Sequence, residues 1–274
     1  MRRPLWTGAI LIGLASCGAI ALAASAQVND RTAVTAAVPI QTPAPASAIP
    51  RKSEPRAVLE LFTSQGCSSC PPADNMVGSF SEDRSIIALS VPVDYWDYLG
   101  WKDTLASPRH TARQRGYAAR RGDREVYTPQ VVINGVAQAL GSDQQAIEGG
   151  IALSHARPGT MTVPVSIAAQ DDKFEITVTP RDESGNEGEV WLCALTRTVP
   201  VAIKRGENRG RTVTYHHVVR RWIRLGRWGG AGQNWTLAKS ELDAGTADAV
   251  AVIVQAGNFE NPGPIFGATM LALR

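Results

Sequence analysis

Two cysteines three positions apart, Cys67 and Cys70, are the residues of this chain whose types and spacing most directly indicate chemistry. An apolar run at 57–62 precedes them, and Pro71 and Pro72 follow. Proline fits the first turn of a helix, where its missing N–H would have no partner. Cys67 is therefore expected beside a helix N-terminus, whose partial positive charge favours a thiolate. A thiolate with a second sulfur one turn later is the working part of a dithiol–disulfide exchanger.

A small structural disulfide and half of a metal site are the alternative interpretations of this pair. Zinc would need two further ligands, and the other cysteines, Cys17 and Cys193, each stand alone. His216 and His217 are adjacent on an expected strand and should point to opposite faces. We therefore expect no metal and no dissociable cofactor, because the cysteine pair itself would carry the electrons. Cys193 is expected to be a small buried hydrophobe, with a role as a resolving thiol as the alternative.

Three residues are predicted to assist the cysteines. Pro129 opens an expected strand against the cysteine turn, and a cis bond after Thr128 would leave the Thr128 backbone free to pair with a substrate peptide. A trans proline at the start of an edge strand is the alternative. Glu60 interrupts the apolar run before Cys67, and a buried carboxylate there could exchange protons with the deeper thiol of Cys70. Strand alternation that turns Glu60 outward is the alternative.

The segment 94–103 is rich in aromatic residues and aspartates. Tyr95 and Trp96 are predicted to form part of a rigid platform for a substrate or partner, with Asp94 and Asp97 fixing the loop by hydrogen bonds. Packing of the same rings onto their own domain is an equal alternative.

The pattern of expected secondary structure changes near residues 157–159. Before this point, strands at 57–63, 85–91, 130–133 and 136–140 alternate with helices at 71–82, 108–121 and 142–155. After it, strands at 161–169, 173–180, 189–199, 212–224, 248–256 and 265–272 are separated by polar turns. The order and the dithiol predict an α/β thioredoxin-like domain at 56–158, followed by a mostly β, sandwich-like C-terminal domain at 159–274.

The N-terminal segment 1–26 has the pattern of an export signal: Arg2 and Arg3, an apolar stretch, and small residues before Gln27. Cys17 ends a lipobox-like sequence, so lipidation there and a retained membrane anchor are the alternatives to cleavage. Residues 27–55 are rich in proline and alanine and read as a disordered linker. We expect a periplasmic or secreted protein, with a possible N-terminal lipid or membrane tether, in a compartment where disulfides persist.

The net charge of +3 is small, but arginines cluster at 109–124, and lysine and arginine again at 204–227. We interpret these clusters as solvated faces, with an acidic partner surface as the next interpretation. Export makes nucleic acid an improbable partner.

The stretch from Val58 to Asp74, which reads VLELFTSQGCSSCPPAD, resembles the opening motif of the bacterial exported domain-of-unknown-function family 1223. Residues 93–97, 127–130 and 205–208 resemble the same family. The resemblance implies a thioredoxin-like superfamily fold and no established reaction. The chain is more distantly similar to periplasmic thiol oxidoreductases, from which the Ser-Ser pair between the cysteines departs.

Together, these patterns predict an exported thiol–disulfide oxidoreductase that acts on protein or small thiol substrates. One alternative is a non-enzymatic binding module in which Cys67–Cys70 is a structural disulfide. The other is a metal carrier that uses both thiolates, against which the scarcity of Met and nearby His argues.

Overall fold

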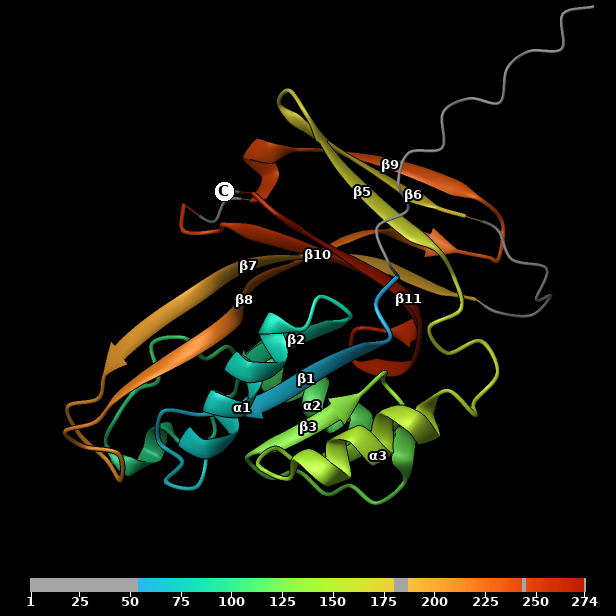
Figure 1. Cartoon of the computed structure of the whole chain (residues 1–274). Coiled ribbons are helices and arrows are strands. Elements are labelled where there is room, and N and C mark those ends of the chain that lie inside the picture. Colours follow the sequence, from blue (N-terminus) through green and yellow to red (C-terminus); the bar gives the residue numbers. More distant parts are fainter. Residues whose placement is uncertain (1–53, 180–186, 243–244, 274) are drawn as a thin grey trace, which may run out of the picture. The chain divides into compact units, whose positions relative to one another are not determined.

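The structure is a computed structural model, and it describes residues 54–179, 187–242 and 245–273 (Figure 1). The predicted export signal, Cys17 and nearly all of the predicted linker lie outside these residues. Within these ranges, no helix is long and apolar enough to cross a membrane.

The described residues contain eleven strands, three α-helices and two short 3-10 helices. In chain order they are β1 (Ala57–Thr63), α1 (Pro71–Glu82), β2 (Ile86–Pro92), η1 (Asp97–Leu99), α2 (Pro108–Arg121), β3 (Gln130–Ile133), β4 (Ala137–Leu140), α3 (Gln144–Ser154), β5 (Val165–Gln170), β6 (Lys173–Val178), β7 (Gly188–Ala202), β8 (Thr212–Trp228), β9 (Gln233–Ala238), η2 (Lys239–Leu242), β10 (Ala249–Asn258) and β11 (Asn261–Ala272).

Eight of these strands form one mixed sheet in the order β11-β10-β7-β8-β2-β1-β3-β4, and β5, β6 and β9 form a separate three-stranded sheet. The prediction of an α/β thioredoxin-like domain followed by a sandwich-like β domain is therefore wrong. The protein is mostly β, and strands from before and after residue 158 share the large sheet. The C-terminal strands extend the sheet that β1 begins, because the long hairpin β7–β8 joins the free edge of β2 (Figure 1).

Side chains complete the junction between β2 and β8, where the parallel ladder is short. Ser90 of β2 lies opposite Val218 of β8, and the Ser90 hydroxyl donates to the His216 carbonyl at 2.7 Å. The Nδ1 atom of His217 lies 3.0 Å from the Ala88 carbonyl. Burial lowers the pKa of His217, which favours the neutral ring that donates this bond. These polar contacts satisfy backbone groups that a longer ladder would have paired.

Strand alternation divides the core into layers. Leu59 and Leu61 of β1 pack with α1 and α3, whereas Val58 and Phe62 face the side that α2 covers. Strands β7 and β10 alternate in the same way, since their other face packs against the three-stranded sheet. Gly116 of α2 permits a close approach to the β10–β11 turn, because a Cβ there would lie 2.2 Å from the Glu260 carbonyl oxygen. Both faces of the central strands are therefore buried.

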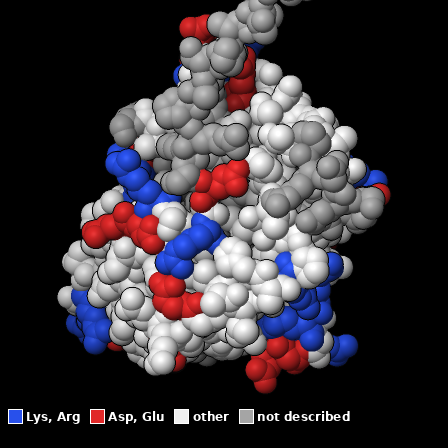
Figure 2. Space-filling model, turned by 45° about the vertical axis from the view of Figure 1, so that its right-hand side comes forward, with Lys and Arg blue, Asp and Glu red and all other residues white. Residues whose placement is uncertain are grey.

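The surface charges are mixed. Figure 2 shows Lys and Arg side chains beside Asp and Glu side chains in several places on one face, with uncharged residues between these groups, in keeping with a solvated surface there. One arginine of the predicted cluster is different: Arg113 of α2 is completely buried, although the sequence suggested that the arginines of this helix are exposed.

Candidate active site

Cys67 and Cys70 form a disulfide in the turn between β1 and α1. Cys70 is the N-cap residue of α1, and Pro71 occupies the first helical position, as predicted. Cys70 is fully buried, Cys67 is 2% exposed, and Ser68 and Ser69 between them are exposed. The helix dipole therefore acts directly on the two sulfurs, and the Cys67 side presents the small accessible edge of the pair.

The backbone around the disulfide is held from three directions. The Asp103 carboxylate accepts the Gln65 N–H at 2.8 Å, and the Cys67 N–H donates to the Ser64 carbonyl at 3.1 Å. The Asn208 amide, from the turn between β7 and β8, donates to the Cys67 carbonyl at 2.8 Å. Gln65 is anchored further, since its side-chain carbonyl accepts the indole N–H of Trp101 at 2.8 Å. The cysteine turn is therefore rigidly placed by bonds that do not involve the sulfurs.

The structure places Thr128 and Pro129 at the same end of the sheet as the cysteines. The bond between them is cis, as predicted. Strand β3 runs antiparallel to β1 with Gln130 opposite Phe62, so Pro129 comes level with the residue that ends β1. A Cβ on Gly141 would lie 3.0 Å from both the Ala73 and the Pro129 side chains, which shows that Pro129 is close to the first turn of α1.

The aromatic segment 94–103 crosses this end of the site. Trp96 donates its indole N–H to the Thr128 hydroxyl at 2.8 Å, and a Cβ on Gly66 would lie 3.0 Å from the Trp96 Cβ. Tyr98 stacks on Trp96 with ring centroids 6.4 Å apart and is 78% exposed. Tyr95 packs against the core on the α2 side. Trp96 therefore bridges the cysteine turn and Thr128, and Tyr98 offers the free aromatic surface.

The acidic residues of this segment fix the loop, in agreement with the predicted hydrogen bonds. Asp94 accepts the Thr111 hydroxyl at 2.5 Å, and Asp97 accepts the Asp103 N–H at 3.0 Å. Asp103 accepts two further N–H groups, those of Leu105 at 2.8 Å and Ala106 at 3.1 Å. Each of these carboxylates therefore has at least one oxygen engaged within the protein. No cluster of potential metal ligands occurs among the described residues.

Asp74 is a buried acid that the sequence reasoning did not single out. It lies one helical turn after Cys70, and its N–H donates to the Cys70 carbonyl at 3.1 Å. One carboxyl oxygen accepts the Thr63 hydroxyl at 2.7 Å, while the other, Oδ2, is buried without a hydrogen-bond partner. Burial raises the pKa of Asp74 to about 8. A neutral carboxyl group therefore stands on the helix face that carries Cys70, since residues four apart are neighbours on a helix.

Glu60 is buried, as predicted, but the structure does not bring it to Cys70. Glu60 shares a strand face with Val58 and Phe62, whereas Leu59 and Leu61 face α1. Its carboxylate accepts two bonds from the guanidinium of Arg113, at 2.6 and 3.2 Å. The predicted proton exchange between Glu60 and Cys70 therefore has no support from this geometry.

The partners of Glu60 form a buried polar network below α2. The Tyr117 hydroxyl donates to Glu60, and the Gln255 side chain accepts from Arg113 at 2.7 Å. The Arg113 guanidinium also lies 4.4 Å from the Trp222 ring centroid. Burial lowers the pKa of Arg113, but the negative charge of Glu60 outweighs it and holds the pKa above its ordinary value. The network has the character of a structural ion pair in the core.

Cys193, His216 and His217, the remaining residues considered from the sequence, each make contacts of their own within the protein. Cys193 is a free, fully buried thiol on the face of β7 that packs with the α2 side of the core, and burial raises its pKa. His216 packs against α1, because a Cβ on Gly78 would lie 2.9 Å from its ring, and His217 binds the Ala88 carbonyl. The histidines thus make separate protein contacts, as their adjacency suggested.

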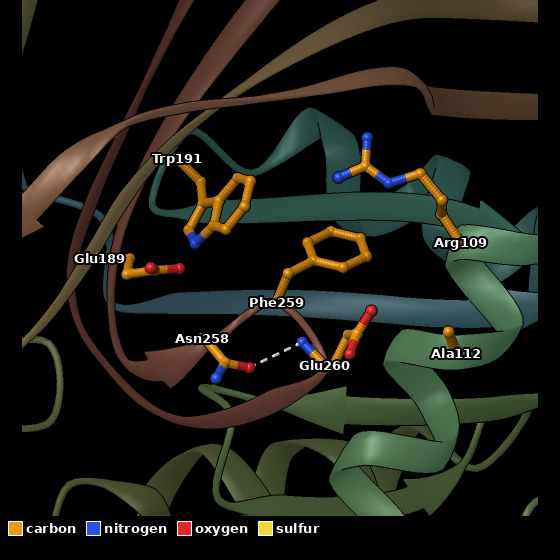
Figure 3. A pocket seen from close by; sticks show the side chains of 7 residues that line it. All are labelled: Arg109, Ala112, Glu189, Trp191, Asn258, Phe259 and Glu260. Carbon is orange, nitrogen blue, oxygen red and sulfur yellow. Dashed lines mark hydrogen bonds between the residues drawn. The ribbon is translucent and has the colours of Figure 1, made fainter.

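A cavity of about 260 Å³ lies on the α2 side of the sheet, and none of the predicted site residues lines it. Figure 3 shows the rings of Trp191 and Phe259 between Glu189 on one side and Arg109 on the other. Arg109 lies 4.5 Å from the Phe259 ring centroid, and Glu189 accepts a bond from Arg224 at 2.7 Å. Arg109 and Glu189 therefore already have partners in the protein, and the cavity adds no group to the cysteine site.

Asp74, Asn208 and Arg113 are the residues of these sites that the sequence reasoning missed. Asp74 could have been noticed as an acidic residue among the apolar positions of α1. Nothing near Asn208 in the sequence indicated its contact with the cysteine turn. Arg113 was grouped with its exposed neighbours, although Glu60 in an apolar strand implied a buried cation.

Comparison with known proteins gives a family and two similar structures. The family described as "Protein of unknown function (DUF1223)" matches residues 58–255. A crystal structure of a protein from Agrobacterium tumefaciens, a structural genomics target, is 33% identical with a TM-score of 0.72, covering 81% of this chain and 96% of that one. HBP35 of Porphyromonas gingivalis is 15% identical with a TM-score of 0.52, covering 80% and 76%, and shows a similarity of fold alone. No curated protein matches the chain.

Proposed function

Since the chain belongs to the DUF1223 family, whose function is unknown, its activity must be argued from its own site, and we propose that it is a thiol–disulfide oxidoreductase. The observation that carries this proposal is the Cys67–Cys70 disulfide at the N-terminus of α1, with a buried carboxyl one turn further along the helix whose Oδ2 atom has no hydrogen-bond partner. A helix N-terminus lowers the pKa of a nearby thiol, and a carboxyl with a free oxygen can give or take the proton that exchange requires.

The exchange would proceed through a mixed disulfide. A substrate thiolate attacks the Cys67 sulfur, the Cys67–Cys70 bond breaks, and the Cys70 sulfur leaves with the electron pair. Asp74, neutral near pH 7, is the group we assign to protonate that thiolate. A second substrate thiolate then attacks the substrate sulfur of the mixed disulfide and releases Cys67, so the substrate is oxidised by two electrons and the cysteine pair is reduced. The reverse sequence reduces a substrate disulfide.

Thr128 and Trp96 are the proposed substrate-side contacts. They lie at the end of the sheet that carries the cysteines and are linked by the bond from the Trp96 indole to the Thr128 hydroxyl. A substrate segment that pairs with the Thr128 backbone would have to displace or accommodate Trp96. The support for a relationship to the thioredoxin-like superfamily is confined to this local arrangement of dithiol and proline, because the sheet as a whole is different. The leader at residues 1–26 supports a location outside the cytoplasm.

The rival proposal is a binding module in which the disulfide is only a brace. A bridge between cysteines three apart closes a very short loop and would stabilise the fold by about 2 kcal/mol in the chain-entropy account. The turn is already fixed by Asn208 and Asp103, so a brace is largely redundant. This redundancy favours the redox function.

The test is the reduction potential of the pair in the full chain, measured by equilibration with glutathione and dithiothreitol buffers followed by alkylation. We expect a value between about −120 and −270 mV, the range of exchange catalysts. A value below about −300 mV, together with no mixed disulfide to a thiol peptide, would establish the brace instead.

A further inference from the structure

The turn between β7 and β8 is part of the cysteine site, although it lies about 140 residues away in sequence. Asn208 in this turn is 1% exposed, and its amide donates to the Cys67 carbonyl at 2.8 Å and to the Gln65 carbonyl at 3.0 Å. Gly206 approaches the aromatic segment, since a Cβ there would lie 3.4 Å from the Trp101 Cβ. Charges on this turn therefore stand next to the disulfide.

Those charges are mostly positive. Exposed cationic side chains surround Asn208 in the turn and on the neighbouring aromatic segment, and they are Lys102, Lys204, Arg205, Arg209 and Arg211. Arg211 is the best placed of them, because its guanidinium donates to the Asn208 side-chain oxygen at 3.4 Å. Glu207 is the exposed carboxylate of the turn, and Asp97 is half-buried.

Three of the turn cations lie outside the ion pairs that the described residues form. In the described part of the chain, none of Lys204, Arg205 and Arg209 forms an ion pair. Opposite charges attract over about 8 Å at physiological salt. The turn contacts the cysteine turn directly, through the bond from Asn208 to the Cys67 carbonyl. A cluster of like charges beside a reactive group raises the local concentration of oppositely charged partners.

From this placement we infer that the cysteine pair acts on polypeptides whose reacting cysteine lies among acidic residues. The inference rests on the proposed exchange function and names its substrate class. The cations are spread over eight positions of the turn, from 204 to 211, so an extended segment with several carboxylates would meet more of them than a small thiol would. In each exchange, the substrate thiolate adds to the Cys67 sulfur and Cys70 leaves, so no further oxidant or reductant enters the step.

The test compares peptides of about ten residues that carry one cysteine flanked by glutamate, glutamine or lysine. The oxidised full chain is mixed with each peptide, and the rate of disulfide opening is followed by acid quenching and mass spectrometry. Mercaptoacetate serves as a small anionic thiol and dithiothreitol as a neutral one. At an ionic strength of about 0.02 M, we expect the glutamate peptide to react at least about 10-fold faster than the lysine peptide, and this ratio should fall toward one at about 0.5 M. When the ionic strength is lowered, the reaction rate with mercaptoacetate should increase by a smaller factor than the rate with the glutamate peptide.

Charge reversal at the turn provides the matched variants. Arg205→Glu combined with Arg209→Glu should remove or invert the preference, while the rate with dithiothreitol stays within about twofold. The control, Arg157→Glu with Lys173→Glu, makes the same charge change at exposed positions outside this turn and should keep the preference.

Two kinds of failure are distinguishable. Equal rates for the acidic and basic peptides, or a preference that survives charge reversal at the turn, would overturn the inference and leave the exchange function standing. A mercaptoacetate gain as large as that of the glutamate peptide would overturn the assignment to polypeptides. No reaction with dithiothreitol or any peptide would refute the exchange function, and the inference with it.

Discussion

Replacing Asp74 by asparagine should change how the stability of the protein depends on pH. Asparagine keeps the shape of the side chain and an oxygen that can accept the Thr63 hydroxyl, but it cannot ionise. Its amide N–H₂ would occupy the position of the buried oxygen that has no partner in the natural protein, at a cost of about 1–3 kcal/mol. This cost is independent of pH, so it cancels when the two proteins are compared at two pH values.

The sign follows from the direction of the shift. Burial raises the pKa of Asp74 from 3.8 to about 8, so the folded protein holds a proton that the unfolded chain releases. The stability from this group is complete below the unfolded pKa near 4 and is lost as the pH rises toward 8. Between pH 5 and pH 8, the natural protein should lose about 3–4 kcal/mol of unfolding free energy relative to the variant.

Urea unfolding of both oxidised proteins at pH 5, 6, 7 and 8 measures this quantity directly. The variant should be the less stable protein at pH 5 and should equal or exceed the natural protein at pH 8. Other groups that titrate in this range contribute equally to both proteins and drop out of the difference. The exposed Asp172, changed to asparagine, is the control, and its stability curve should run parallel to that of the natural protein.

Parallel curves for the Asp74 variant as well would refute the reasoning, because they would mean that the carboxyl is already ionised in the folded protein at pH 5. The same variant tests the proton role. Disulfide exchange should lose the pH inflection near 8 that Asp74 would impose, and an unchanged pH–rate profile would exclude Asp74 as the proton donor to Cys70.

Three further outcomes are expected. Cys70→Ser should accumulate mixed disulfides through Cys67 with thiol peptides, and equal accumulation by Cys67→Ser would reverse the assigned order of attack. Glu60→Gln should lower the unfolding free energy by about 3 kcal/mol, since it leaves the charge of Arg113 buried and unpaired, while the exchange rate per folded molecule stays unchanged; slowed exchange would restore a proton role for Glu60. Burial lowers the pKa of His110 to about 4, so stability from this residue is present above pH 6.5 and lost toward pH 4. His110→Asn should therefore flatten the acid side of the urea-stability profile, and an unchanged acid side would show that His110 is not buried as a neutral ring.

The local structure around the cysteines could be predicted from neighbouring residues alone. Two prolines after Cys70 fit the first turn of a helix but not its interior, and α1 begins at Pro71 as predicted. Asn134 and Gly135, both with positive φ, form the turn between β3 and β4 that the Asn-Gly pair predicts. These features depend on neighbouring residues, whose steric preferences act whatever the rest of the chain does.

Which strands pair with one another depends on packing across the whole fold. The alternating patterns of β7, β8, β10 and β11 predicted strands correctly, but alternation shows only that a strand has a buried face and not which edge it pairs with. The β7–β8 hairpin joined β2 instead of closing a separate sandwich. Ser90 and His217, which complete that junction, are polar residues inside strands, and no pattern along the chain connects two positions so far apart.

Some residues of the candidate site could be identified from local sequence, whereas others depend on the tertiary fold. The cysteine pair could be identified from its spacing, because a dithiol three positions apart at a helix start is a local arrangement. The side of the sheet to which the Glu60 side chain points could not be identified in this way. A shift of one residue along the strand exchanges the side that faces Cys70 for the side that faces Arg113. Asp74 and Asn208 acquire their roles only from burial and from a contact across the fold, and both depend on packing that the finished sheet alone creates.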